Sequence, residues 1–257
     1  MTAFKEGAGQ GTYVKSNWPH IEKILTKKVK EYFIINQKAV LPVKGRPMIF
    51  LTTHGSLNAT FPAMAIIAKA YMDNGLGDMV IGIYPHPAVL WIPGMKWAFK
   101  KAGTPVNAYE PEKLMDLLNK GILQVTGTAP EGLSCNFAWD EYVGPLRSGG
   151  MMEVAIKTGA TICLVAHQGG DLWNIRVRLP FGLKVPLTGG LRGINIPLPP
   201  VRVIKKYGVY FKRYKPGITA TAISKMNKRE KRLALNVEMA KVKSQFMAMT
   251  DKVMEKM

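Results

Sequence analysis

The stretch Pro47-Met-Ile-Phe-Leu-Thr-Thr-His54 decides the fold and places the first candidate for chemistry. It is a short apolar run that begins after a proline and ends at a histidine, and such a run indicates a strand buried on both faces. Gly55 then allows close backbone approach, and Ser56 is suited to cap a following helix. The stretch therefore predicts a strand-to-helix unit with His54 at the carboxyl end of the strand.

The rest of the chain alternates between strand and helix patterns. Strands are expected over 79–84, 122–127 and 160–166, and helices over 60–72, 91–102, 112–119 and 151–158. This alternation predicts an α/β fold with a mostly parallel central sheet flanked by helices. Ligands of such sheets bind beyond the carboxyl ends of the strands. His54 and Glu131 each follow a predicted strand, so we expect chemistry there.

Amphipathic helices are expected near both ends of the chain. Apolar residues at steps of three and four predict an N-terminal helix over 18–33 and a C-terminal helix with a methionine-rich seam. We expect an α/β domain over residues 1–224, which includes the N-terminal helix, and a basic amphipathic helix over 225–257. The C-terminal helix either packs on the domain or a second subunit, or inserts into lipid.

The charge balance points to a polyanionic partner. The chain has 36 Lys and Arg against 17 Asp and Glu, a formal net charge of +19, although 47% of its residues are hydrophobic. Anionic lipid headgroups, an acidic carrier and nucleic acid all fit such a surplus. The segment 201–215 interleaves aromatic and basic residues, which suits either base stacking or an edge strand lying on headgroups. No RNA-binding or zinc-finger signature accompanies it, so we expect an anionic membrane surface and no nucleic acid.

Targeting and metal signals are missing from the sequence. The first residues lack the apolar core of a secretory signal, and no run reaches the 18 or more apolar residues of a membrane span. Cys135 and Cys163 have no metal-ligand spacing, so we expect ordinary thiols, no metal and no cofactor. A cytoplasmic protein that lies peripherally on the membrane is the expectation.

The four histidines narrow the search for a general base. His20 is expected at the surface of the first helix, and His86 lies in a loop between two prolines. His167 follows a predicted strand and is a candidate to line a cleft. His54 has the strongest local context of the four.

Four blocks together resemble the PlsC-like glycerolipid and lysophospholipid acyltransferase superfamily, over roughly residues 45 to 200. Residues 53–56 resemble the first family block, in which a catalytic histidine is followed five residues later by an aspartate. Residues 93–106, 129–134 and 144–162 resemble the later blocks in the correct order. The third of the four blocks, residues 129–134, contains the Pro130-Glu131-Gly132 core.

The resemblance implies acyl transfer from a thioester donor, acyl-CoA or acyl carrier protein, to a hydroxyl or amine of a lipid-like acceptor. His54 is then the general base, which is typically worth roughly 10² to 10⁴ in rate. Backbone N–H groups near Gly132 or Gly55 would stabilise the oxyanion, and Glu131 would help to shape the acceptor pocket. The substrate-binding positions implied are Gly55, Ser56, Pro130, Gly132, Ser134 and Arg147.

This chain departs from the family pattern at two places. The position of the family's Asp is Ala59, so Asn58 or Glu131 is expected to hold the imidazole instead, and an Ala59→Asp variant is expected to be as active as the wild type or modestly more so. The third block also lacks its usual arginine, which leaves only Arg147 on a neighbouring loop. We therefore expect a neutral alcohol, a sugar or an amine as acceptor rather than a glycerol phosphate.

A second hypothesis from another class stays open. Ala59 favours a catalytically inactive family member that acts as a lipid- or carrier-binding module. Thioester cleavage by the wild type and by a His54→Ala variant separates this module from an enzyme.

Overall fold

A computed structural model describes residues 11–53, 59–83, 110–131, 143, 146, 149–178, 193–197 and 202–257. A seven-stranded sheet runs through the molecule in the order β1-β4-β5-β3-β6-β9-β2, and β7 and β8 form a separate antiparallel pair. Neighbours within the main sheet are parallel except for β1 with β4 and β6 with β9. The predicted α/β fold with a mostly parallel sheet is confirmed. The strands are β1 (Thr12–Tyr13), β2 (Val29–Ile35), β3 (Met48–Thr52), β4 (Val80–Ile83), β5 (Val125–Thr128), β6 (Thr161–Gln168), β7 (Asn174–Arg178), β8 (Gly193–Pro197) and β9 (Ile204–Tyr214).

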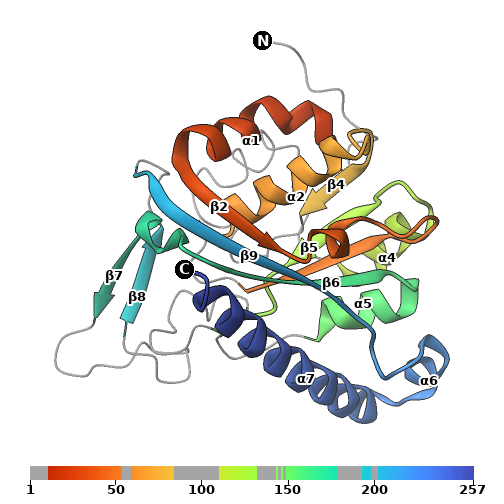
Figure 1. Ribbon diagram of the computed structural model, residues 1–257. Coiled ribbons are helices and arrows are strands. Elements are labelled where there is room, and N and C mark those ends of the chain that lie inside the picture. The colour runs from red at the N-terminus through yellow and green to blue at the C-terminus, as the bar shows by residue number, and fades with distance from the viewer. Residues whose placement is uncertain are drawn as a thin grey trace.

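Helices cover both faces of this sheet (Figure 1). On one face, α1 and α2 pack over a core that includes Phe50, Cys163 and Phe211. On the other face, α4, α5 and α7 pack over a core that includes Ile49 and Leu164. The helices are α1 (Val14–Lys28), α2 (Phe61–Asp73), α4 (Pro111–Asn119), α5 (Gly150–Thr158), α6 (Ala220–Lys225) and α7 (Lys228–Met254), with 3-10 turns η1 (Gln37–Val40) and η4 (Gly170–Trp173).

Strand β3 is the buried strand that the opening stretch predicted. Four of its five residues, Met48 to Leu51, are buried, and they alternate between the two cores. It lies between β5 and β6, both parallel to it, with Leu51 beside Thr128 and Thr52 beside Val165. The carboxyl ends of β5, β3 and β6 therefore meet at one edge of the sheet.

The N-terminal helix is shorter than expected. The helix ends at Lys28, and the residues from Val29 onward form β2, which pairs in parallel with β9. The apolar spacing of Leu25, Val29 and Phe33 continues a helical period, but Val29–Ile35 is rich in β-branched and aromatic residues, which favour strands. The expected helix over 18–33 is thus wrong beyond residue 28.

The segment over 201–215 is not an edge strand. Its core forms β9, which lies between β6 and β2. Tyr207, Val209 and Phe211 are fully buried in the core beneath α1 and α2. The aromatic side chains at these positions are therefore structural, because neither stacked bases nor headgroups can reach them.

Helix α7 packs on the sheet through its seam. Leu235, Met239, Val242, Phe246 and Met249 are buried in the same core as β3 and β6. Its start is fixed by a capping box in which Asn227 accepts hydrogen bonds from Arg229 N and Glu230 N while Glu230 accepts one from Asn227 N. The sequence left open whether this helix packs on the domain or a second subunit, or inserts into lipid. Its inner face packs on the domain.

A buried carboxylate also anchors α7. Glu238 accepts hydrogen bonds from the Tyr214 hydroxyl at 2.7 Å, the Gly217 N–H at 3.1 Å and the Lys241 ammonium at 2.7 Å. Burial alone would raise the pKa of Glu238, but these three hydrogen bonds outweigh it and hold the pKa below its usual value. The carboxylate therefore ties α7 to the end of β9 and to the turn that follows it.

Candidate functional site

The carboxyl edge of β5, β3 and β6 brings together positions that the sequence singled out. His54 follows Thr53, the residue after β3, and Glu131 follows β5 on one side of it. His167 is the penultimate residue of β6, on the other side of β3. Residues 54–58, which include His54, Gly55, Ser56 and Asn58, lie outside the described residues, as do Gly132, Ser134 and Arg147.

Pro130 and Glu131 are both buried at this edge, and Glu131 is only 2% exposed. A carboxylate is rarely buried to this extent without a structural or functional reason. The helix expected over 91–102 lies outside the described residues.

Thr53, the residue immediately before His54, is fixed to β6 by several hydrogen bonds. Its backbone N–H donates to the Val165 carbonyl at 2.9 Å, and its hydroxyl accepts from the His167 N–H at 3.4 Å. In addition, Nε2 of the His167 ring lies 2.7 Å from the Thr53 carbonyl oxygen. A carbonyl can only accept, so Nε2 carries the proton and Nδ1 of the neutral ring does not. Thr53 thus holds a defined position just upstream of His54.

His167 is buried rather than placed on an open surface. Its side chain is 4% exposed, and its ring stacks on that of Tyr207 with centroids 5.7 Å apart and planes inclined by 17°. Burial lowers the pKa of His167 to about 4, against a smaller opposite effect of the hydrogen bond to Thr53. At neutral pH the ring is an uncharged donor and not a base, so His167 is no competitor to His54 for proton transfer.

Tyr207 makes a matching contact downstream of His54. Its hydroxyl donates to the Ala59 carbonyl oxygen at 2.8 Å, and Ala59 is the first described residue after the 54–58 segment. Burial raises the pKa of Tyr207 well above its usual value, so the hydroxyl keeps its proton and remains a donor. Sequence reasoning missed this residue because it lies 148 positions away from its acceptor.

Ala59, which the resemblance aligns with the Asp of the first block, is buried and closely packed. It is 3% exposed and packs against Gly170, where an added Cβ would lie 2.6 Å from the Ala59 Cα. The expectation that an Ala59→Asp variant retains full activity needs revision, because the carboxylate would be buried in a tightly packed contact.

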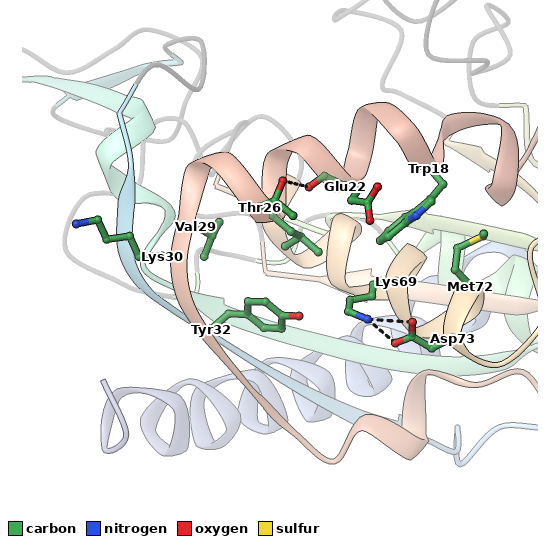
Figure 2. A pocket seen from close by; sticks show the side chains of 10 residues that line it. Trp18, Glu22, Thr26, Val29, Lys30, Tyr32, Lys69, Met72 and Asp73 are labelled. Carbon is green, nitrogen blue, oxygen red and sulfur yellow. Dashed lines mark hydrogen bonds and ion pairs between the residues drawn. The ribbon is translucent and has the colours of Figure 1, made fainter.

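A groove of about 520 Å³ lies between α1, the start of β2 and α2 (Figure 2). Trp18, Leu25 and Met72 supply its apolar surface, and the Lys69–Asp73 ion pair spans part of its wall, with Nζ to Oδ2 at 2.7 Å. Of the site candidates that the structure describes, neither Glu131 nor His167 lines this groove.

The described part of the chain contains neither a cluster of metal ligands nor a reactive cysteine. No group of three or more His, Cys, Asp or Glu among the described residues is placed to hold a metal ion. Cys163 is buried, and burial raises its pKa to about 12, so it is an inert thiol, as expected. His20 is exposed on α1, as expected. Within the described ranges, no helix combines the length and the apolar character that crossing a bilayer requires.

The chain is similar to the 1-acyl-sn-glycerophosphate (LPA) acyltransferase PlsC from Thermotoga maritima, with a TM-score of 0.45 and 17% sequence identity over 90% of this chain and 81% of that one. No family model matches the sequence, and no curated protein matches it either.

Proposed function

We propose that the chain is an acyltransferase that moves a fatty acyl group from a thioester to a hydroxyl or amine of a lipid-like acceptor, with His54 as general base. The observation that carries this proposal is the convergence of three carboxyl strand ends. They bring Glu131, the residue before His54, and His167 to one edge of the sheet. Catalytic groups of parallel sheets collect at such edges.

The reaction requires one proton to move and one bond to be exchanged. His54 takes the proton of the acceptor hydroxyl or amine while that atom attacks the thioester carbonyl carbon. The tetrahedral oxyanion collapses, the carbon–sulfur bond breaks, and the protonated imidazole returns the proton to the departing thiolate. Backbone N–H groups near Gly55 and Gly132 are the proposed donors to the oxyanion. The protein needs no metal or cofactor for this chemistry, since acyl-CoA or acyl carrier protein is a co-substrate.

The proposed acceptor is a neutral alcohol, a sugar or an amine. An arginine normally binds a phosphate bidentately, and the segment 129–135, where the family carries one, contains none. Arg147 remains as a substrate-binding candidate, together with Ser56, Pro130 and Ser134.

An anionic membrane surface is the proposed location, on the cytoplasmic side. The net charge of +19 supports it, and so does the outer face of α7. Leu233, Val237 and Met247 are between 52% and 58% exposed there, and their spacing places them on one stripe opposite the buried seam. The exposed basic residues Arg232 and Lys252 lie beside the stripe. An apolar stripe with basic flanks is typical of helices that lie in the headgroup region.

The experiment measures thiol release from palmitoyl-CoA and from palmitoyl acyl carrier protein, with acceptors offered in parallel. Monooleoylglycerol and sphingosine represent a neutral alcohol and an amine, and oleoyl-glycerol phosphate represents the phosphorylated class. We expect turnover with one of the first two, and a loss of roughly 10²-fold or more in His54→Ala. The control is His20→Ala, which removes an exposed histidine of α1 and should leave turnover unchanged.

Two outcomes contradict the proposal. Equal turnover in the wild type and in folded His54→Ala would show that His54 is not the general base. No turnover with any donor, accompanied by retained binding to palmitoyl-CoA or to anionic vesicles, supports the alternative of an inactive binding module.

A further inference from the structure

Exposed apolar side chains gather where the turn after β6 meets the start of β9. Leu172 of η4, Ile175 of β7 and Val203 are between 41% and 47% exposed. The Trp173 indole N–H donates to the Arg202 carbonyl oxygen at 2.8 Å, and this hydrogen bond joins the two segments that carry these side chains. Apolar residues that are exposed as a group, rather than singly, are typical of a surface that contacts a partner.

Basic side chains border this apolar group. Lys30 of β2 and Lys205 of β9 are exposed, as is Arg202. The parallel register that places Glu31 beside Lys206 also places Lys30 beside Lys205, on the other face of the sheet. Within the described ranges, no ion pair joins Lys30, Arg202 or Lys205 to an acidic residue. Their charges are therefore available to a partner.

The segments that form this surface carry an excess of positive charge. Residues 27–31, 171–175 and 202–206 contain six basic residues and two acidic ones. Lys206 does not belong to the surface, because its ammonium donates to the Lys256 carbonyl oxygen at 2.6 Å. We use the name docking face for the exposed residues Lys30, Leu172, Ile175, Arg202, Val203 and Lys205.

The docking face borders the carboxyl edge of β3 and β6. An added Cβ on Gly169, the residue after β6, would lie 2.4 Å from the Lys206 carbonyl oxygen. Two residues after Lys205, the Tyr207 hydroxyl donates to the Ala59 carbonyl oxygen at 2.8 Å. Figure 1 shows the starts of β2 and β9 on the same side of the molecule as β7, and α6 on the opposite side. A partner seated on the docking face therefore lies beside the edge at which acyl transfer is proposed.

We propose that the docking face binds acyl carrier protein, a small acidic protein, and that this carrier delivers the acyl group. This inference rests on the proposed function and selects one of its two thioester donors. A carrier holds its thioester on a flexible arm, so it docks beside the reacting groups rather than over them. Exposed cations around an apolar centre are complementary to an acidic helix with apolar residues on its contact side.

The docking face is distinct from the surface proposed to meet the membrane. Lys30 lines the groove beside α1 and α2, and Lys205 has the same strand parity as Tyr207, which is buried beneath these helices. The stripe proposed to lie on lipid belongs to α7, which covers the other face of the sheet. An acidic carrier and an anionic membrane can therefore bind the chain at the same time.

Two double variants change the docking face. Lys30→Glu with Lys205→Glu reverses two of its charges, and Leu172→Ser with Val203→Ser removes two of its apolar side chains. The matched control is Lys215→Glu with Lys225→Glu, which changes the net charge by the same amount. Lys215 and Lys225 are exposed, the first just after the far end of β9 and the second in α6.

Two measurements are made on each variant. The first is the Kd of fluorescently labelled acyl carrier protein, obtained from fluorescence anisotropy at low and at physiological ionic strength, which needs no turnover. The second is KM for palmitoyl acyl carrier protein and for palmitoyl-CoA, with monooleoylglycerol as acceptor. We expect the charge reversal to raise the Kd and the carrier KM roughly 10- to 100-fold, with KM for palmitoyl-CoA within about twofold.

The apolar variant and the control make the expectation specific. The apolar variant should raise the Kd roughly tenfold at both ionic strengths, because lost apolar contacts are not screened by salt. Lys215→Glu with Lys225→Glu should stay within about twofold of the wild type, since its charges lie far from the docking face. Binding of the docking-face variants to anionic vesicles should equal that of the wild type.

Several outcomes overturn the inference. A wild type that does not bind the carrier does so directly, and equal weakening in the control would mean that net charge alone attracts it. An equal rise of KM for palmitoyl-CoA would assign the lysines to the phosphates of CoA. Weaker vesicle binding with unchanged carrier binding would make the docking face a membrane surface.

The anisotropy measurement separates this inference from the function on which it rests. If the wild type shows no turnover with either donor, the proposed function fails, and the Kd values alone decide whether the carrier docks here. If one double variant does not fold, the other carries the test.

Discussion

Ala59 and Gly170 are in backbone contact, so close that a Cβ on Gly170 would lie 2.6 Å from the Ala59 Cα and 2.8 Å from its Cβ. The contact joins the start of the segment before α2 to the turn after β6. It leaves Ala59 3% exposed. Position 59 is therefore tightly enclosed by packing in this chain.

An Ala59→Asp variant should lose stability rather than gain activity. The new carboxylate would be buried without space for its hydration, and we expect the free energy of unfolding to fall by about 3 kcal/mol or more. Urea unfolding of Ala59→Asp beside Ala59→Ser, which adds only a small hydroxyl, measures the effect. Wild-type stability together with raised turnover would show instead that the position has room for a His–Asp arrangement.

Gly170→Ala tests the same contact from the other side. The added Cβ would overlap with backbone atoms that cannot move aside. We therefore expect the free energy of unfolding to fall by about 2 kcal/mol, which is typical of overpacking. Gly77→Ala is the control, because the nearest atom to a Cβ there is Met72 Sδ at 3.0 Å, the end of a flexible side chain. Thermal or urea unfolding of both variants should show the larger loss at Gly170, and equal losses would contradict the close contact.

Buried His167 should make stability depend on pH between about 6.5 and 4. The folded-state pKa is about 4 and the ordinary value is 6.5. In this window the unfolded chain binds a proton that the folded chain does not. The free energy of unfolding is therefore highest above pH 6.5 and falls as the pH drops toward 4. Between pH 7 and pH 5 the loss should be about 2 kcal/mol by linkage.

Urea unfolding of the wild type and of His167→Gln at pH 7 and pH 5 measures that loss. The two pH values lie above the ordinary pKa range of carboxylates, so Glu153 and Glu238, whose pKa values are lowered, stay ionised throughout. The pH-dependent loss should shrink by about 2 kcal/mol in the variant. An equal loss in both proteins would mean that His167 is accessible to protons in the folded state.

Glu238→Gln should loosen α7 from the sheet. The neutral amide cannot replace a carboxylate that accepts three hydrogen bonds, so we expect the free energy of unfolding to fall by about 2 kcal/mol. Glu230→Gln is the control on the same helix, because Glu230 lies in the exposed capping box. Hydrogen exchange of α7 amides beside urea unfolding should show the larger effect for Glu238→Gln, and comparable effects would mean that the buried contact contributes little.

The outer stripe of α7 should determine binding to anionic vesicles. A Leu233→Ser and Val237→Ser double variant removes two exposed apolar side chains, and we expect roughly tenfold weaker co-sedimentation with vesicles of phosphatidylcholine and phosphatidylglycerol. Val203→Ser, at a similarly exposed valine before β9, is the control. Sedimentation equilibrium of the same proteins detects a second copy on the stripe instead. A wild type that does not bind, or that dimerises through the stripe, contradicts the membrane proposal.

The layered architecture could be predicted because local patterns determine it. Met48–Thr52 is apolar throughout, as a strand buried on both faces must be, and Gly121 and Gly159 end their helices with positive φ. The start of β2 could not be placed, because Lys28 passes directly into Val29 without a glycine or proline to mark the change. The internal place of β9 also escaped local patterns, since pairing with β2 joins residues about 175 positions apart.

The candidate site was predicted only in part for a similar reason. The strand ends predicted the edge to which Thr53, Glu131 and His167 come, because adjacent parallel strands end together. The inward turn of His167 and the hydroxyl of Tyr207 depend on contacts more than 100 residues apart. The spacing of residues along the chain does not predict such contacts.

The two edge strands of the sheet both belong to the N-terminal segment: β1 pairs with β4 at one edge and β2 with β9 at the other, and α1 alone connects them. During synthesis β2 leaves the ribosome early, directly after β1 and α1, yet its only partner among the described strands, β9, is the last of them to emerge. Folding of the nascent chain therefore cannot finish before residue 210 has left the exit tunnel. Until then the backbone N–H and C=O groups of β2 have no strand to pair with, so we expect this strand to be a binding site for chaperones.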